Sequence, residues 1–457
     1  MADTIAAVAT AMTASGIGII RISGPESREI AGKIYRSKGG KKRLENVPSH
    51  TIQYGFICDE DEIIDEVLVM VMDAPRSYTG ENTVEIDCHG GVLAMKRVLE
   101  TVIKYGARPA EPGEFTKRAF LNGRIDLSQA EAVIDVINAK NEYALKSSVS
   151  QLRGNIQRVI KEIRQGIIYQ IAYIESALDD PEHISIDGYG DTLKEEISLL
   201  KEKLNGLLNT VREGKLMKEG IKTVIVGKPN AGKSSLLNLL VGEERAIVTD
   251  IAGTTRDILE ETIVLHGISL RMIDTAGIRD TDDVVEKIGV KKAVENAKDA
   301  DLILYVVDSS VPLDENDKEI IELLKDKKAI VILNKMDLQQ QVTEEDLKAK
   351  TDHPVVAVSA KEEEGIENLE AQIKELFFEG DLSFNDEIYI TNMRHKAALE
   401  DAKRSLELVE NSIEMQMPED FFSIDLMNAY EALGSIIGES VGEDLLNEIF
   451  SKFCTGK

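Results

Sequence analysis

The 457-residue chain has no tryptophan and only three cysteines, Cys58, Cys88 and Cys454. The cysteines form no C-x-x-C pair, so their spacing is typical neither of a zinc site nor of a disulfide framework. The chain also lacks an apolar run of transmembrane length and a basic, then apolar, signal segment at its N-terminus. These absences favour a soluble protein of the reducing cytoplasm that is not bound to a membrane.

Positively charged residues are also few relative to negatively charged ones. Lys and Arg number 54 against 82 Asp and Glu, which gives a formal net charge of −28. Such a surface repels nucleic-acid backbones at long range, so a chain of this charge that handles RNA is expected to need a more basic partner. One group of cations has the spacing of a single helix face: Arg153, Arg158, Lys161 and Arg164. This group is either a local patch that binds RNA or simply a solvated helix face.

Residues 227–234 read Gly-Lys-Pro-Asn-Ala-Gly-Lys-Ser, the G-x-x-x-x-G-K-[ST] pattern of a phosphate-binding loop. An apolar, β-branched run at 221–226 precedes it and a helical pattern follows, which is the context that this motif requires. Backbone N–H groups of the loop and of the helix N-terminus are expected to hold phosphates. Lys233 is expected to reach the β- and γ-phosphates, and the Ser234 hydroxyl to ligate Mg²⁺.

Further motifs follow in the order expected of a guanine-nucleotide-binding domain. Residues 253–257 supply a switch threonine, and Asp-Thr-Ala-Gly at 274–277 supplies a carboxylate for the Mg²⁺ shell and an N–H for the γ-phosphate. Asn-Lys-Met-Asp at 334–337 ends in a carboxylate that accepts from two guanine donors, which adenine cannot offer together. Ser-Ala-Lys at 359–361 is typical of the loop behind the base. The strand and helix patterns between these motifs favour a parallel, doubly wound sheet.

The position that carries a water-orienting glutamine in small signalling GTPases is Ile278 here. Hydrolysis therefore needs another polar group. Glu286 is the preferred candidate because a carboxylate can accept a proton from the attacking water. The alternative is that Glu286 is one of several solvated charges in an acidic stretch.

Asn230, inside the phosphate loop, suggests a monovalent cation site. Its side-chain oxygen and main-chain oxygens from about 249–254 can hold a cation beside the β- and γ-phosphates, where other GTPases place an arginine. A local turn hydrogen bond is the alternative function of this side chain.

These motifs resemble those of the MnmE (TrmE) family of tRNA modification GTPases. The resemblance extends over essentially the whole chain, beginning at residues 3–7, 21–25 and 121–132. It continues through GKPNAGKSSLLN, TDIAGTTRD, DTAGIRD and NKMD to the terminal Phe-Cys-Thr-Gly-Lys at 453–457.

The resemblance implies a potassium-stimulated GTPase that forms a homodimer and whose G domains pair when the cation is bound. It also implies that the protein acts on tRNA with a flavin-dependent partner, MnmG (GidA). Together they would add an aminomethyl or carboxymethylaminomethyl group to C5 of the wobble uridine. The one-carbon unit would come from a tetrahydrofolate derivative, formyl- or methylene-tetrahydrofolate.

The resemblance further assigns residues to the nucleotide and its ions. The K⁺ ligands would be Asn230, Thr249, Ile251 and Thr254, and the Mg²⁺ ligands Ser234 and Thr255. Glu286 would be the catalytic glutamate. The full set of nucleotide contacts would be Asn230, Ala231, Gly232, Lys233, Ser234, Ser235, Thr249, Asp250, Ile251, Ala252, Gly253, Thr254, Thr255, Asp274, Thr275, Ala276, Gly277, Asn334, Lys335, Asp337, Ser359 and Ala360.

A second site is implied for the folate, at Arg21, Glu85, Arg124 and Lys457. Guanidinium groups and a carboxylate suit a ligand that has carboxylates and a donor-rich pterin ring. The family usually has lysine where this chain has Arg124. Without the resemblance, each of the first three residues would be interpreted as a member of a surface ion pair.

Cys454, near the end of the chain, is the candidate for chemistry on the uracil ring, as a thiolate or an acid/base group. The apolar residues before it favour a tail that docks on the protein. The alternative is an inert, packed thiol.

The expected fold class is a multidomain chain with an α+β N-terminal domain, an all-α central domain and an inserted α/β P-loop GTPase domain. The boundaries are a folate-binding domain at 1–120, a helical domain at 121–217 and 381–457, and a G domain at 218–380. In the first domain, strands are expected at 17–22, 66–72 and 83–86, with a helix at 92–105. Helical patterns cover 138–174 and 389–410.

Two other functions are compatible with a GTPase domain. A GTPase switch in ribosome assembly would be expected to have an RNA-binding module such as a KH domain, whereas this chain ends in helical patterns and a cysteine-containing tail. A membrane-remodelling GTPase would need a basic amphipathic or apolar anchor, which the sequence lacks. The tRNA-modifying GTPase is therefore preferred.

Overall fold

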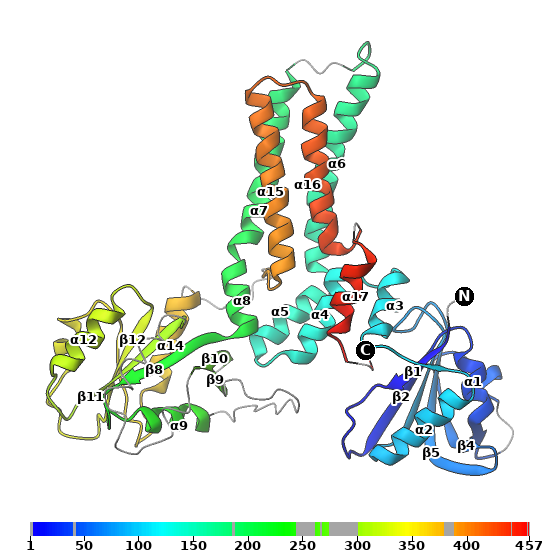
Figure 1. Cartoon of the computed structure of the whole chain (residues 1–457), viewed down its shortest axis with the longest axis horizontal. Coiled ribbons are helices and arrows are strands. Elements are labelled where there is room, and N and C mark those ends of the chain that lie inside the picture. Colours follow the sequence, from blue (N-terminus) through cyan, green and yellow to red (C-terminus); the bar gives the residue numbers. More distant parts are fainter. Residues whose placement is uncertain are drawn as a thin grey trace. The chain divides into compact units, whose positions relative to one another are not determined.

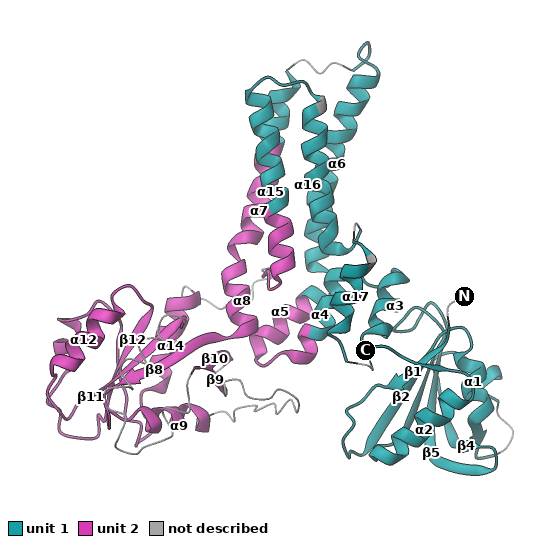
Figure 2. Cartoon of the chain, in the orientation of Figure 1, with its two compact units in different colours: residues 1–134, 151–196, 401–457 teal, residues 135–150, 197–400 magenta. Residues whose placement is uncertain are grey.

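The computed structural model describes residues 3–39, 43–184, 188–243, 261–265, 267–273, 300–378, 388–439, 441–454 and 456. The chain forms two compact units (Figure 2). Unit 1 comprises residues 1–134, 151–196 and 401–457, and unit 2 comprises 135–150 and 197–400. The expected division into three domains stays a prediction.

A seven-stranded sheet is the centre of the first part of unit 1 (Figure 1). Its order is β3-β4-β5-β6-β2-β1-β7, and every pair is antiparallel except β1 with β7. The strands are β1 (Ile5–Val8), β2 (Ile17–Ser23), β3 (Tyr35–Ser37), β4 (Thr51–Asp59), β5 (Glu62–Met72), β6 (Thr83–His89) and β7 (Arg108–Pro109). The three strands and the helix expected here are present, with β5 and β6 longer than expected.

Alternation along the strands decides which side chains enter the core. Ile20 and Ile22 of β2 lie in a fully buried cluster with residues of helices α1 (Ser27–Ile34) and α2 (Val92–Lys104). Arg21, between them, belongs to the opposite face because successive strand residues alternate. The helices α1 and α2 therefore leave the Arg21 face of the sheet available to other groups.

The remaining helices outside the six-stranded sheet described below lie mostly where the sequence pattern is helical. Helices α6 and α16 pack side by side in unit 1 (Figure 1). The pattern at 138–174 is divided between helices, and Gly154 at its last break has a φ of 85°. The bounds are α3 (Glu114–Leu121), α4 (Leu127–Asn138), α5 (Glu142–Leu152), α6 (Asn155–Asp179), α7 (Tyr189–Asn209), α8 (Val211–Glu219), α15 (Met393–Glu414), α16 (Asp420–Ile437) and α17 (Glu443–Ser451), with the short 3₁₀ helix η1 at Leu44–Asn46.

Unit 2 contains a six-stranded sheet in the order β13-β12-β11-β8-β10-β9. Five strands are parallel, as expected, but β9 pairs antiparallel with β10 at the edge. The expectation of a parallel sheet was therefore wrong at this edge, where β9 and β10 are consecutive strands of the chain. The strands are β8 (Ile221–Gly227), β9 (Glu261–Leu265), β10 (Ile268–Met272), β11 (Leu302–Asp308), β12 (Ala329–Asn334) and β13 (Val355–Ala357).

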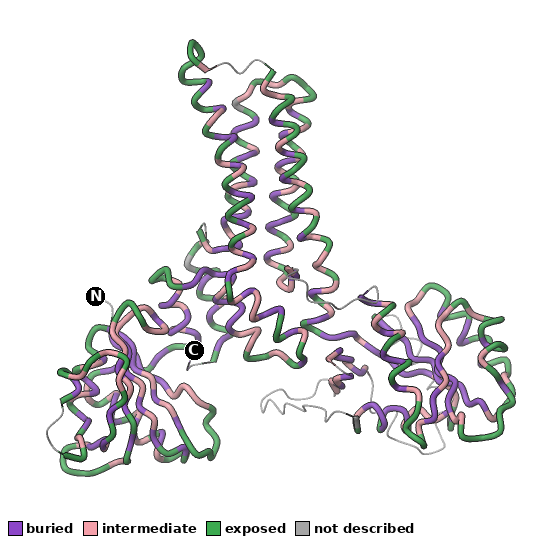
Figure 3. Tube along the Cα trace, turned by 180° about the vertical axis from the view of Figure 1, so that it is seen from behind, coloured by how far each residue is buried: buried purple, intermediate pink, exposed green. Residues whose placement is uncertain are grey.

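Two apolar clusters cover the two faces of this sheet. One cluster includes residues of α9 (Lys233–Glu243) and α14 (Ile366–Phe378), and the other includes residues of α12 (Glu315–Leu324) and α13 (Glu344–Lys348). Strands β11 and β12 are buried along their whole length, as is usual for strands covered on both sides, and the centre of this sheet is purple in Figure 3. Within the described part of the chain, no helix combines the length and apolarity that crossing a bilayer needs.

Candidate functional site

The phosphate loop lies between β8 and α9, and Lys233 is the first residue of the helix. Gly232 has a φ of 96°, and a Cβ there would lie 2.1 Å from the side-chain nitrogen of Asn334. Only glycine allows this close approach. Asn230 also has a left-handed backbone, with a φ of 61°, and its side chain is exposed. The loop therefore has the compact form needed to point N–H groups at one ligand.

The Lys233 ammonium group bends back over its own loop. Its Nζ donates to the carbonyl oxygens of Gly227 (2.9 Å) and Lys228 (2.7 Å). Burial lowers the pKa of Lys233 because the charged form loses solvation. Both acceptors are neutral carbonyl groups, so a negatively charged phosphate can compete for the ammonium group of Lys233.

Lys228 fixes the outer side of the loop. Its Nζ forms ion pairs with Asp314 (3.0 Å) and with the buried Asp317 (2.7 Å). Burial opposes the charge on Lys228, but the two carboxylates outweigh it and raise the pKa. Asp317 also accepts from the buried Tyr305 hydroxyl at 2.6 Å, which places the whole group at the N-terminus of α12.

Asn334 joins three predicted nucleotide-binding segments. It is 1% exposed; its Nδ2 donates to the carbonyl oxygen of Ala231 (3.0 Å) and its Oδ1 accepts from the Ala360 N–H (3.2 Å). The phosphate loop and the loop after β13 are therefore tied to the end of β12. Parallel strands bring these ends to one edge of the sheet, which is where α/β proteins bind ligands.

Other residues of the predicted base-binding segments are held by contacts within the protein. The Ser359 hydroxyl donates to the Asp337 carboxylate at 2.9 Å, which orients the proposed guanine acceptor. Lys335 has a φ of 63° and forms an ion pair with Asp308 at 2.5 Å. Burial opposes the charge on Asp308, but hydrogen bonds from Lys335 and Ser310 outweigh it and lower the pKa.

A cavity of about 540 Å³ borders this site. Its lining includes Ser235 and Ala360, two of the predicted nucleotide contacts, together with residues of α9. The other predicted residues, which belong to the switch segments and the chain end, lie outside the described residues: Thr249, Asp250, Ile251, Ala252, Gly253, Thr254, Thr255, Asp274, Thr275, Ala276, Gly277, Glu286 and Lys457.

The predicted folate residues Arg21 and Glu85 are cross-strand neighbours on β2 and β6. Arg21 Nε lies 2.7 Å from Glu85 Oε1, and the two side chains are 14% and 16% exposed. The Arg21 guanidinium also lies over the rings of Tyr78 (5.1 Å) and Phe115 (5.6 Å). The pair is thus partly buried and packed, unlike a surface ion pair.

Tyr78 was missed by the sequence analysis. Its ring contacts the guanidinium groups of both Arg21 and Arg124, the latter at 5.0 Å. Arg124 also donates to the Tyr78 carbonyl oxygen at 2.9 Å. A tyrosine in a loop gives no signal of its own, because only the fold brings residues 21, 78 and 124 together.

The C-terminal tail docks in unit 1. Phe450 and Phe453 lie in an apolar cluster with residues of α3 and α4. The Gly113 N–H donates to the Cys454 carbonyl oxygen at 3.2 Å, and a Cβ on Gly113 would lie 2.4 Å from the carbonyl oxygen of Phe450. Arg21 Nη1 donates to the Gly456 carbonyl oxygen at 3.4 Å. The tail therefore reaches the arginine cluster, which is formed by Arg21 and Arg124 around the Tyr78 ring.

The three thiols differ in their surroundings. Cys58 and Cys88 are buried, and burial raises the pKa of Cys88 to about 11, which makes it a poor nucleophile. Cys454 is exposed at its docked position. Of the three, it is the thiol that a substrate can reach.

The suggested cationic helix face is not formed by all of its members. Arg164 is buried, its guanidinium lies 3.9 Å from the Tyr430 ring centroid, and it forms an ion pair with Glu439. It therefore joins α6 to α16 and is not available to an RNA backbone. Helical spacing placed the cations on one face but did not show that this face is partly buried by α16.

A phosphate loop, a buried Asn334 that ties it to the base-binding loops, and a carboxylate oriented for guanine define a P-loop GTPase. The chain matches the model described as the MnmE helical domain over residues 127–454 and the one described as the GTP-binding protein TrmE N-terminus over 4–124.

Full-length relatives give the same result. The chain is 62% identical to the tRNA modification GTPase MnmE of Lachnoclostridium phytofermentans, covering 100% of this chain and 99% of the relative. It is 50% identical, with the same coverage, to the protein of that name from Clostridioides difficile. The chain therefore belongs to the MnmE family of tRNA modification GTPases, and the fold class and enzyme class expected from the sequence are confirmed.

Among solved structures, the G domain of the T. maritima FeoB iron transporter is 28% identical to the part it matches. The match covers 34% of this chain and 98% of that chain, with a TM-score of 0.26. That score is too low to compare the two folds.

Proposed function

We propose that this GTPase uses Mg²⁺ and K⁺ and acts in the cytoplasm as a homodimer with the flavin-dependent partner MnmG (GidA). The complex adds an aminomethyl or carboxymethylaminomethyl group to C5 of the wobble uridine of certain tRNAs. The one-carbon unit comes from a tetrahydrofolate derivative. The single observation that best supports the GTPase part is Asn334, which holds the phosphate loop and the base loop together.

In this proposal the chain's residues first bind and orient GTP. Lys233 exchanges its two carbonyl acceptors for phosphate oxygens, and the Ser359 hydroxyl keeps the Asp337 carboxylate turned to receive the guanine donors. The base site then needs little reorganisation when GTP binds, and this lowers the entropic cost of binding.

The two metal ions have suitable donors in this chain. Hydroxyl groups of Ser234 and Thr255 are hard oxygen donors of the kind that Mg²⁺ takes in P-loop enzymes. The exposed side chain of Asn230, with oxygens of Thr249, Ile251 and Thr254, would hold K⁺. Such a cation stabilises negative charge that develops on the phosphates. Glu286 would orient the attacking water and accept its proton.

The folate part of the proposal is supported by the Arg21, Glu85 and Arg124 cluster and by the tail that reaches it. Positive and negative groups lie within one partly buried cluster, so a ligand with both carboxylates and ring donors can be satisfied there. Lys457 would add a cation, and Cys454 would act on the uracil ring. The net charge of −28 favours a partner that supplies most of the contact with tRNA.

The test is mass spectrometry of wobble nucleosides in tRNA from cells that lack this chain. Complementation with the wild type is expected to restore the C5-modified uridine, and complementation with Cys454→Ser is expected to fail. A nucleoside profile that does not change on deletion would contradict the modification role and leave the GTPase assignment intact.

A further inference from the structure

We propose that Tyr78 is a positioning residue for the predicted folate site, the cluster that contains Arg21, Glu85 and Arg124. Its ring holds the guanidinium groups of Arg21 and Arg124, and Arg124 then supplies the positive charge for a carboxylate of the ligand. This inference rests on the proposed function, from which it takes a folate derivative as the ligand.

The contacts around the ring are the first support. The Arg21 and Arg124 guanidinium carbons lie 5.1 Å and 5.0 Å from the centroid of the Tyr78 ring, within the range of cation–π attraction. The ring is held in turn by its hydroxyl, which shares a hydrogen bond of 2.8 Å with Thr116. Two like charges that would otherwise repel are thus both stabilised by one aromatic group.

The two arginines differ in how much of their charge is available. Arg21 is committed to Glu85 at 2.7 Å. Arg124 donates to a neutral acceptor, the Tyr78 carbonyl oxygen, and forms no ion pair with any residue that the structure describes. Because the charge of Arg124 is not compensated by these residues, Arg124 is the group expected to bind a carboxylate of the ligand. Arg21 and Glu85 lie side by side and offer the ligand a hydrogen-bond donor and a hydrogen-bond acceptor.

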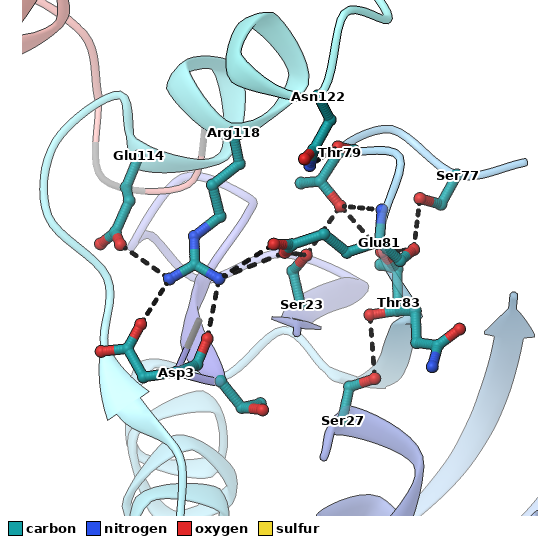
Figure 4. A network of polar contacts seen from close by, with 12 residues as sticks. Asp3, Ser23, Ser27, Ser77, Thr79, Glu81, Thr83, Glu114, Arg118 and Asn122 are labelled. Atoms are coloured by element: carbon teal, nitrogen blue, oxygen red, sulfur yellow. Dashed lines mark hydrogen bonds and ion pairs between the residues drawn. The ribbon is translucent and has the colours of Figure 1, made fainter. Parts of the chain in front are cut away.

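The backbone on both sides of Tyr78 is anchored, as Figure 4 shows. The Ser77 hydroxyl donates to the Glu81 carbonyl oxygen at 2.6 Å. On the other side, the fully buried Thr79 hydroxyl lies 2.7 Å from the buried Ser23 hydroxyl. Tyr78 therefore extends from a loop segment whose neighbours are fixed, which is the condition for holding other side chains in place.

The same loop is tied to helix α3 by ionic contacts (Figure 4). Arg118 lies 3.2 Å from Glu81 of the loop, 3.0 Å from Glu114 and 2.7 Å from Asp3, and its side chain is 11% exposed. Arg118 is therefore a structural cation that fixes the loop, distinct from the uncompensated Arg124 three positions after α3 ends.

The experiment measures binding of 5-formyltetrahydrofolate to the purified full-length chain by isothermal titration calorimetry. Tyr78→Leu is expected to weaken binding about tenfold, because both guanidinium groups lose their aromatic support. Tyr78→Phe keeps the ring and is expected to bind within about threefold of the wild type. Tyr54→Leu is the matched control, since it removes a tyrosine of β4 whose ring contacts another cation, Lys38.

A double-mutant cycle separates positioning from a general loss of structure. If Tyr78 acts through Arg124, then Tyr78→Leu in an Arg124→Leu background is expected to weaken binding less than it does in the wild type. Unchanged affinity in Tyr78→Leu, an equal loss in Tyr78→Phe, or additive losses in the double variant would each overturn the inference. Absence of binding to the wild type would instead contradict the folate part of the proposed function, before any variant is considered.

Discussion

The nucleotide site and the arginine cluster around Tyr78 are built in opposite ways. The nucleotide site uses short motifs at the ends of neighbouring parallel strands, and Asn334 joins its phosphate loop to its base loop. The arginine cluster draws single residues from β2, β6, a loop and the segment after α3, far apart in the sequence. A site made from local motifs can be read from sequence, whereas a site made from dispersed residues depends on the fold.

The strongest test of this comparison is Lys233→Ala, which removes the central cation of the motif-built site. Loss of a charge-assisted contact to two phosphates is expected to weaken GTP binding more than about a hundredfold. Equilibrium binding of a fluorescent GTP analogue measures this. Lys335→Ala, which lies at the base end, serves as a comparison, and wild-type affinity in Lys233→Ala would contradict the phosphate-loop assignment.

Glu286→Ala tests catalysis separately from binding. We expect GTP hydrolysis to slow by about a hundredfold, because general-base and water-orienting groups typically contribute that much, with GTP affinity nearly unchanged. Single-turnover hydrolysis and equilibrium binding are the two measurements. The neighbouring Asp282→Ala is the matched control for a change of surface charge, and equal rates in both variants would reduce Glu286 to a solvated carboxylate.

Replacement of K⁺ by Na⁺ probes the cation site that Asn230 is proposed to form. Turnover is expected to fall about tenfold, because a misplaced cation loses part of its stabilisation of phosphate charge. Steady-state rates at constant ionic strength measure it. Asn230→Ala should remove the difference between the two salts, and equal wild-type rates would exclude a selective cation site.

In the dispersed site, Glu85→Gln leaves the partly buried Arg21 without its ion-pair partner. The free energy of unfolding of the protein is expected to fall by about 1–2 kcal/mol, since a charge that is not fully exposed loses its compensation. Chemical denaturation of the full chain measures it. Glu62→Gln, which breaks the exposed pair with Arg97, should have almost no effect, and equal losses in the two variants would show that burial is not the cause.

The smallest effect is expected from Asp3, whose pKa is lowered to about 2 by a hydrogen bond from Arg108 and by the nearby Arg118. A depressed pKa means that the folded form is favoured above the ordinary aspartate pKa and that this stabilisation is lost as pH falls from about 4 to about 2. Because Asp3 is 54% exposed, screening limits the effect to less than about 1 kcal/mol. Denaturation at several pH values should show a shallower acid slope in Asp3→Asn, and an identical slope would contradict this.

Outside the nucleotide-binding motifs, the sequence predicted some elements of the fold correctly and missed others. The strand pattern at 17–22 identified β2, and the helical pattern at 92–105 identified α2, because each pattern reflects which faces are buried. The antiparallel edge strand β9 was missed, since pairing direction depends on the hairpin that places it. Arg164 had the spacing of an exposed cation, yet packing of α16 against α6 buries it.

The phosphate loop, the guanine-binding motif and the family are evident in the residues alone, because in each of them the chemistry requires particular residues at fixed short spacings. Resemblance also indicated Arg21, Glu85 and Arg124. The contact of Tyr78 with these arginines, and the approach of the tail that carries Cys454, follow from the folded arrangement. Contacts between residues so distant along the chain are set by strand register and helix packing, which no local pattern records.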